Sequence, residues 1–437
     1  MIDRLSKADM LGLGFMTFAF FLGAGNIIFP PLAGMFAGQS VLPAMLGFLT
    51  TAVGLPLLGL FAVARAGGGI PEMTKPLAAW VGVVLSVAIY TIIGPLIAAP
   101  RTALVAFELG YQPFYASAEG SQVVYSAVFF SVATALALYP GKLMDSVGKI
   151  LTPLLIILLL TLSATVLLGD AGDLKLPVKG YESAPYVTGF IEGYNTMDAL
   201  ASIMFGMLII DILKKKGVTA PSAQYRYLVV AAVIAALGLA AVYISLFYLG
   251  ANNAELVPDA QNGGAILSAY VQQQFGLTGS LVLAGVITLA CLTTAVGLIS
   301  ACSDYFNSLL PRVSYRAFVF LNALVCIAIA NLDLSKLIGL SIPVLVASYP
   351  IAIALIIYSL VKGHLATPHM TLIAVLVVST LFGFVEGSKV AGVEMSWLAF
   401  LPFFDVGMAW VSPIAIVISA SIFIRLFKIS PVTEVKA

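Results

Sequence analysis

The sequence predicts an all-α polytopic membrane protein with about twelve transmembrane helices. Of its 437 residues, 61% are hydrophobic and 9% are charged, whereas a soluble globular protein carries about 25% charged residues. A soluble fold of this size could not cover so much apolar surface, because its surface-to-volume ratio leaves too much of the chain outside. The net charge of +1 offers no basic footprint, so we expect no nucleic-acid partner. The lipid bilayer is the expected environment.

Long apolar runs between polar breaks define the expected spans. A membrane helix needs about 20 mostly apolar residues, whereas a transmembrane β-strand needs about 10 in alternation, so these runs favour helices. The runs lie near residues 9–35, 41–64, 77–107, 121–139, 150–168, 189–213, 227–250, 279–301, 315–330, 337–361, 369–385 and 405–427. The connections are short and leave no sizeable domain outside the membrane. Residues 264–275, ahead of the eighth span, are expected to form a surface helix.

The distribution of Lys and Arg supports this division of the chain. Segments rich in these residues stay in the cytoplasm. With the N-terminus inside, 16 of the 21 Lys and Arg residues fall in cytoplasmic segments and 4 fall outside, while Arg101 lies within a span. A wrong number of spans would scramble this alternation. The split therefore favours twelve spans, with both termini in the cytoplasm.

Two spans carry residues that are unusual at membrane depth. The first contains two glycines, an asparagine and two prolines within residues 23–31, and the sixth contains polar groups at 192–198. A tight glycine-mediated helix contact and a polar cap near the membrane surface are the plain explanations for each segment alone. Non-helical backbone is tolerated at this depth where it lines a cavity, and paired interruptions in two halves indicate an inverted-repeat secondary transporter. This predicts repeats at 1–170 and 185–362, with residues 363–437 appended.

At these segments the chain resembles the bacterial branched-chain amino acid:cation symporter family. The first motif is GFMTFA at 14–19 followed by LGAGNIIFPP at 22–31. Further matches are PRT at 100–102, YPGKL at 139–143, GY at 193–194, TMD at 196–198, ACL at 290–292 and TAVGL at 294–298. The resemblance implies import of leucine, isoleucine and valine across the bacterial cytoplasmic (inner) membrane, driven by sodium or, in some members, by protons. It also implies the leucine-transporter-like 5+5 inverted repeat, with two extra helices.

The resemblance implies a substrate site at the two interruptions. Its expected residues are Gly23, Ala24, Gly25, Asn26, Tyr194, Asn195, Thr196 and Asp198. A zwitterion needs a partner for each charge once it leaves water. Unwound backbone at residues 23–25 and the positive end of the half-helix near Asn26 suit the carboxylate. Carbonyls around Tyr194 and Asn195, with the carboxylate of Asp198, suit the ammonium group. The walls of the apolar pocket cannot be chosen among so many apolar residues.

The resemblance also implies a sodium site. Its expected ligands are the carbonyls of Ala19, Leu22 and Ala290 and the hydroxyls of Thr293 and Thr294. Threonine in a membrane helix often bonds back to its own helix, which is the alternative explanation of the two hydroxyls. A second sodium site is matched only by Asn26 and Thr196, because the seventh span contains no Asn or Asp. Asp198 could substitute as a ligand there.

Three other functions compete with sodium-coupled import. The same fold could carry another small solute or use protons. An intramembrane enzyme could use Arg101, Glu108 and Asp198, but the chain has no nucleophile motif or His/Cys cluster, so we expect no enzymatic activity. A channel would show a repeated polar filter sequence, which is not visible. Arg101 and Glu108 share a helix face, and we weigh an ion pair between helices against a role in gating.

Overall fold

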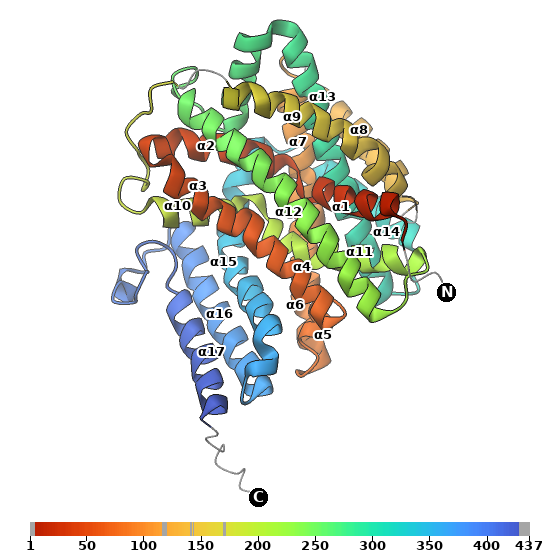
Figure 1. Cartoon of the computed structure of the whole chain (residues 1–437), viewed down its shortest axis with the longest axis vertical. Coiled ribbons are helices and arrows are strands. Elements are labelled where there is room, and N and C mark those ends of the chain that lie inside the picture. Colours follow the sequence, from red (N-terminus) through yellow and green to blue (C-terminus); the bar gives the residue numbers. More distant parts are fainter. Residues whose placement is uncertain (1–4, 116–119, 140–141, 143, 169–171, 428–437) are drawn as a thin grey trace, which may run out of the picture.

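The structure is a computed structural model of the chain, shown in Figure 1. It describes all residues except 1–4, 116–119, 140–141, 143, 169–171 and 428–437. The described residues form helices joined by short connections. The first part contains α1 (Lys7–Phe21), α2 (Ala24–Ala37), η1 (Gly38–Ser40), α3 (Val41–Leu49), η2 (Thr50–Gly54), α4 (Leu55–Ala66), α5 (Ile70–Met73), α6 (Ala79–Thr91), η3 (Ile92–Leu96), α7 (Ala98–Gly110), α8 (Ser121–Ala137), η5 (Met144–Leu151) and α9 (Thr152–Leu168). The second part contains α10 (Pro185–Glu192), η6 (Gly193–Thr196), α11 (Asp198–Lys215), α12 (Pro221–Asn252), α13 (Gly263–Leu309), α14 (Tyr315–Ile329), α15 (Leu334–Val361), η7 (Lys362–His364), α16 (Pro368–Val390), η8 (Ser396–Leu398) and α17 (Val411–Leu426).

Each expected span coincides with one helix or with a run of consecutive helices. Among the described residues, seven continuous helical stretches are long and apolar enough to cross a membrane, some of them made of several consecutive labelled helices, and the bent pair α10 and α11 makes eight. Helices α8, α14 and α17 are apolar but have 17, 15 and 16 residues. These are shorter than the about 20 residues that a full span needs. The polytopic all-helical fold is therefore confirmed, whereas the count of twelve stays a prediction.

The interruption of the first span lies at Leu22 and Gly23. Helix α1 ends at Phe21 and α2 begins at Ala24, which confirms a break in this segment. The amide of Gly23 donates to the carbonyl of Phe21 and to the side chain of Asn26, so it does not continue the α1 ladder. Pro30 and Pro31 do not cause the break, because they lie inside the continuous helix α2.

The sixth span is broken at the expected place. Helix α10 ends at Glu192, the 3-10 turn η6 follows, and Met197 has a φ of 65° before α11 begins at Asp198. The two halves meet at 42°. The left-handed conformation at Met197 interrupts the helical backbone and places Asp198 in the first turn of α11. A carboxylate in that position is stabilised by the positive end of the helix dipole.

A third break, in the third span, was not expected from the sequence. Helix α6 gives way to the π-helical turn η3, where Gly94 has ψ near −110°, and α7 then starts at Ala98. Proline at position 95 lacks the amide that a continuous helix would use. The dipeptide Gly94–Pro95 was the available signal. The break brings the first turn of α7, with Arg101, to the interior of the protein.

The segment before the eighth span agrees with the sequence prediction. Helix α13 contains one non-helical residue, Gly276, with a φ of 58°. It divides α13 into a shorter helix over residues 263–275 and a long helix that continues to Leu309. The shorter helix has nearly the bounds of the helix expected at 264–275, and it buries Ile266, Leu267 and Tyr270 on one face; its position at the membrane surface stays a prediction. Glycine is the residue that adopts this left-handed φ without strain.

The two halves of the first span lie at the centre of the helix bundle. Helices α1 and α2 both pack against α12 and α13 (Figure 1). Helix α2 and helix α12 approach through Gly34 and Gly250, where an added Cβ would collide with the carbonyls of Phe247 and Pro31. This close approach fixes α2 against α12 and so fixes the position of the first break.

An ion-pair network joins the ends of three elements on the face that carries the N-terminus of α1. The ammonium of Lys149 lies 2.5 Å from Asp9 and 2.9 Å from Asp145, and Lys216 lies 2.8 Å from Asp145. These pairs link α1, η5 and the segment after α11. Hydrogen bonds from Lys216 and then Lys149 hold the pKa of Asp145 below its usual range.

We expect Asp145→Asn to lower the melting temperature slightly at pH 7. Exposed ion pairs contribute about 0–1 kcal/mol each, so the effect is small. Because the pKa of Asp145 is lowered by folding, its stabilisation is complete above its unfolded pKa of about 3.9. It is lost as the pH falls through the lower folded value. Thermal unfolding at pH 7, 5 and 3 checks this: the difference from wild type should persist at pH 5 and shrink at pH 3. A difference that shrinks already at pH 5 would contradict the assignment to Asp145.

Candidate functional site

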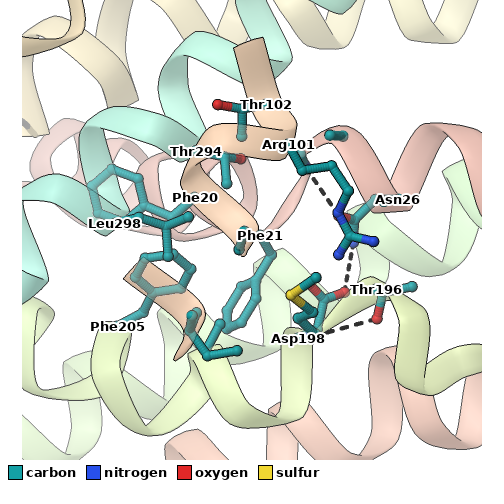
Figure 2. Close-up of a pocket in the computed structure, with 17 residues that line it drawn as sticks. Phe20, Phe21, Asn26, Arg101, Thr102, Thr196, Asp198, Phe205, Thr294 and Leu298 are labelled. Carbon is teal, nitrogen blue, oxygen red and sulfur yellow. Dashed lines mark hydrogen bonds between the residues drawn. The ribbon is translucent and has the colours of Figure 1, made fainter. Parts of the chain in front are cut away.

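A small cavity lies where the three breaks meet. It has a volume of about 20 Å³ and is lined by both halves of the first span, by η3 and α7, by η6 and α11, and by α13 (Figure 2). That volume holds about one water molecule. A branched-chain amino acid therefore requires these lining elements to move apart. The cavity combines an apolar side with a polar side that contains buried charges.

Asp198 is the centre of the polar side. Its side chain is buried, with a residue exposure of 2%. Its Oδ2 accepts hydrogen bonds from Asn26 Nδ2 at 2.6 Å and from the hydroxyl of Tyr243 at 2.7 Å. Asn26 also donates to the Tyr243 hydroxyl. The sequence placed Asp198 and Asn26 together, but it did not reveal Tyr243, which is one aromatic residue in the long apolar helix α12.

Arg101 brings a positive charge to the same place. It is 2% exposed, its guanidinium donates to the carbonyl of Asn195 at 3.1 Å, and it lies over the ring of Phe29. It also interacts electrostatically with Asp198. Figure 2 shows the side chain directed toward Asn26 and Asp198. Arg101 therefore reaches from α7 across to the second break, and its contacts there join two helices; the choice between such a structural role and gating stays a prediction.

The expected backbone donors at the first break are partly used within the protein. The amide of Gly23 donates to Asn26 Oδ1 at 3.1 Å. The amides of Ala24 and Gly25 begin helix α2, and amides in a first helical turn have no partner within their own helix. Ala24 and Gly25 line the cavity. Two backbone amides, those of Ala24 and Gly25, therefore remain to bind a carboxylate, whereas the sequence predicted three.

The second break contributes less free backbone than expected. Tyr194 and Asn195 are not among the residues that line the cavity, whereas Thr196 and Asp198 are. The Tyr194 carbonyl accepts from Met197, and the Asn195 carbonyl accepts from Arg101. Tyr194 itself is buried away from the cavity lining, with its ring stacked on Tyr349 at a centroid distance of 4.0 Å. Asp198 is thus the group at this break best placed to face an ammonium.

The residues expected to bind sodium come together between α1 and α13. The hydroxyls of Thr293 and Thr294 both donate to the carbonyl of Ala19 at 3.1 Å, and Thr293 also donates to Ala290 at 2.9 Å. The Ala19 carbonyl is available because the Gly23 amide, its helical partner, turns away at the break. An added Cβ on Gly23 would lie 2.9 Å from the Thr294 hydroxyl, so the peptide bond between Leu22 and Gly23 also lies close to this hydroxyl.

Aromatic and aliphatic side chains form the apolar side of the cavity, which the sequence could not identify. Phe20 and Phe21 precede the first break, and both contact Phe205 of α11 with ring centroids 5.3 and 5.2 Å apart. Ile93 and Leu298 complete this wall. Phe20 and Phe21 could have been chosen because they adjoin the break. Phe205 follows Asp198 by seven residues and Leu298 follows Thr294 by four, but apolar neighbours at such spacings are common in this chain.

We expect Gly25→Ala to weaken leucine uptake about tenfold. An added Cβ would lie 3.0 Å from the Asn195 carbonyl and 3.3 Å from Thr196 Cα, so it would push the two breaks apart. A displacement well below 1 Å is enough for such an effect, since a 1 Å misplacement can cost about 100-fold. Uptake of labelled leucine into vesicles measures it. Gly285→Ala, where nothing lies within 4 Å, is the matched control, and equal uptake by both variants would contradict the close approach.

The comparisons with known proteins agree with this geometry. The family described as "Branched-chain amino acid transport protein" matches residues 6–428. The chain belongs to this family. A relative from Pseudomonas aeruginosa, the branched-chain amino acid transport system 2 carrier protein, is 48% identical over 418 residues, which cover 95% of each chain. The branched-chain amino acid permease BrnQ of Escherichia coli K12 is 42% identical over 425 residues, which cover 97% of each chain. Members of the family are named carriers and permeases, and this chain is a transport protein and not an enzyme.

Solved structures of other transporters share the fold of this chain. Mhp1, a nucleobase-cation-symport-1 family transporter with bromovinylhydantoin bound, aligns with a TM-score of 0.59 at 14% identity. The alignment covers 97% of this chain and 94% of Mhp1. MhsT in complex with L-phenylalanine aligns with a TM-score of 0.57 at 16% identity, covering 97% and 99%. The leucine-transporter-like fold expected from the sequence is confirmed by these neighbours.

Proposed function

We propose that this protein is a sodium-coupled symporter that imports leucine, isoleucine and valine by alternating access. The observation that supports it most is the convergence of three broken helices on one cavity with an apolar side and a charged side. Secondary transporters bind their substrates where discontinuous helices meet near the middle of the membrane. The names of the Pseudomonas and Escherichia relatives supply the substrate class.

The substrate would lie with its charged end at the breaks and its side chain among the phenylalanines. The carboxylate would accept from the first-turn amides of Ala24 and Gly25, where the dipole of α2 favours a negative charge. The ammonium would pair with Asp198, which carries the buried negative charge of the cavity. The branched side chain would pack against Phe20 and Phe205, and this burial favours leucine, isoleucine and valine over polar amino acids.

The oxygen atoms between α1 and α13 fit a sodium ion. Hard cations prefer oxygen ligands, and broken helices supply them as unpaired carbonyls. The Ala19 carbonyl is released at the end of α1, and the hydroxyls of Thr293 and Thr294 converge on it. These three groups, with the carbonyls of Leu22 and Ala290, would hold the ion. A bound sodium would supply positive charge that fixes the end of α1 against α13.

Asn26, Thr196 and Asp198 match a second sodium site only in part, because several of their polar atoms already have partners within the protein. Asn26 and Tyr243 already fill the Oδ2 side of Asp198, and Thr196 donates to the Gly193 carbonyl. A buried carboxylate with neutral donors around it is also suited to carry a proton. Coupling to protons therefore remains the second candidate, and it rests on this burial of Asp198.

The protein would lie in the bacterial cytoplasmic membrane with both termini in the cytoplasm. This orientation rests on the 16-to-4 distribution of Lys and Arg in the sequence. The network of Asp9, Asp145, Lys149 and Lys216 would then close the cytoplasmic side. It links the first turn of α1 to η5 and to the residue that follows α11.

Uptake of labelled leucine into proteoliposomes tests the proposal. A sodium gradient alone should drive accumulation, an excess of unlabelled isoleucine or valine should suppress it, and collapse of the gradient should stop it. If only a pH gradient drives accumulation, the coupling ion is the proton and not sodium. Absence of leucine uptake under both gradients would overturn the proposed substrate class.

A further inference from the structure

The C-terminal pair α16 and α17 lies outside the ten helices of the two expected repeats, and a segment between them turns back against α16. We name residues 403–410 the return segment. The Lys389 ammonium donates to the Phe404 carbonyl at 2.5 Å and lies 4.3 Å from the centre of its ring. Glu386 Oε1 accepts from the amide of Ala409 at 3.0 Å. Two charged side chains of α16 thus hold both ends of the return segment.

Three buried polar atoms gather behind this contact. Glu386 is 1% exposed, and its second oxygen, Oε2, has no hydrogen-bond partner among the described residues. The indole N–H of Trp410 and the hydroxyl of Tyr194 are also buried, and neither makes a close hydrogen bond to a described residue. The two face each other in a longer, weaker hydrogen bond, and Tyr194 also interacts electrostatically with Glu386. Buried polar groups are nearly always paired, so each such exception requires an explanation.

Tyr194 belongs to η6, the second break of the candidate site. Its ring stacks on Tyr349 of α15, and α15 packs along α16 (Figure 1). The return segment also reaches the outer half of the sixth span, because a Cβ on Gly407 would lie 3.5 Å from Ile191 of α10. Gly407 has a φ of 72°, a conformation that glycine adopts without strain. The return segment therefore touches both α10 and the break that precedes Asp198.

We propose that Glu386 is a positioning residue for the second break, which it controls through the return segment and Trp410. This rests on the proposed function, since the break matters only if the substrate binds beside Asp198. In the arrangement seen here, Glu386 Oε2 accepts no hydrogen bond from a described residue, and Tyr194 and Trp410 share only a long, weak one. A small movement of α10 and η6 lets one of these donors pair with Glu386 Oε2. That hydrogen bond stabilises the moved break, so the C-terminal pair biases the substrate site between two arrangements.

Fluorescence of Trp410 tests the coupling directly. The chain has three tryptophans, and Trp80 and Trp397 are exposed, so Trp80→Phe with Trp397→Phe leaves Trp410 as the reporter. In proteoliposomes of this double variant, sodium and leucine together should shift the Trp410 emission, whereas sodium with glutamate should not. Addition of Glu386→Ala should remove the shift. If the double variant still accumulates leucine but its Trp410 emission does not change when leucine is added, the proposal is overturned. Absence of leucine uptake by the wild-type protein would overturn the proposed function instead.

Uptake kinetics supply the second readout. Glu386→Ala should raise the half-saturating leucine concentration about five- to tenfold, within the range of measured couplings between sites. Glu386→Gln should raise it less, because glutamine keeps one acceptor oxygen for Ala409 and replaces the other by an amide that cannot accept. The control is Glu394→Ala, which removes an exposed carboxylate from the connection that follows α16. Equal kinetics of Glu386→Ala and Glu394→Ala overturn the proposal. If Glu386→Ala fails to reach the membrane, Glu386→Gln decides: a raised half-saturating leucine concentration supports the proposal, and wild-type kinetics overturn it.

Discussion

Asp198→Asn is expected to abolish leucine uptake. The substitution keeps the size of the side chain and one oxygen for the donors Asn26 and Tyr243, but it deletes the buried negative charge. Removing one partner of a buried charge pair costs about 3–5 kcal/mol, so uptake should fall at least about 100-fold. Initial uptake rates, normalised to protein in the membrane, measure this. The exposed Asp259→Asn is the control and should transport normally.

Thermal stability shows which cation Asp198 serves. If its partner is Arg101, the Asp198→Asn protein leaves a buried positive charge unpaired and should unfold at a lower temperature. The double variant Asp198→Asn with Arg101→Gln should then recover part of that loss. If Asp198 serves only the substrate or an ion, the single variant should be as stable as wild type and still inactive. Wild-type uptake and stability in Asp198→Asn would show that the carboxylate has neither role.

The broken helices could be predicted because their residues conflict with a continuous membrane helix. Glycine and polar side chains cluster at 22–26 and 192–198, and the structure breaks the chain within both segments. The prolines were a weaker guide. Pro30 and Pro31 continue α2, since neighbouring helices can satisfy the freed backbone groups, whereas Pro95 lies in a break that was not expected. Proline alone therefore does not locate an interruption at membrane depth.

The partners across the cavity could not be predicted, because they depend on how distant helices cross. Asp198 meets Tyr243 from a helix 45 residues further along the chain, and Arg101 meets the Asn195 carbonyl 94 residues away. Nothing in the local pattern of α12 sets Tyr243 apart from its other aromatic residues. Glu386 lies in the appended segment 363–437, and its contact with the return segment depends on a turn at Gly407 that has no periodic signature in the sequence.

The residues expected to bind sodium were chosen by resemblance, and the structure gives a physical reason for their positions. Thr293 donates both to Ala19 and to Ala290 of its own helix, which is the back-bonding expected of many membrane threonines. Thr294 donates to Ala19, across the gap between α13 and α1. The hydroxyl of Thr294 is therefore the one whose position depends on the broken end of α1.

Thr294→Ala is accordingly expected to raise the sodium concentration for half-maximal leucine uptake about 5- to 150-fold. Loss of one buried polar partner costs about 1–3 kcal/mol, and 1.4 kcal/mol corresponds to tenfold in affinity. The protein should still reach the membrane, because alanine is the best helix former. Uptake of leucine at varied sodium concentration measures the shift at a fixed membrane potential.

Two further variants make the sodium assignment refutable. Thr294→Ser keeps the hydroxyl and should retain most of the sodium affinity, whereas Thr161→Ala removes an exposed threonine that bonds back to Ile157 in α9 and should change nothing. Thr293→Ala should have a smaller effect than Thr294→Ala, since the Thr293 hydroxyl divides its bonding between two carbonyls. Unchanged sodium dependence in both alanine variants would mean that Ala19, Thr293 and Thr294 hold α1 against α13 and bind no coupling ion.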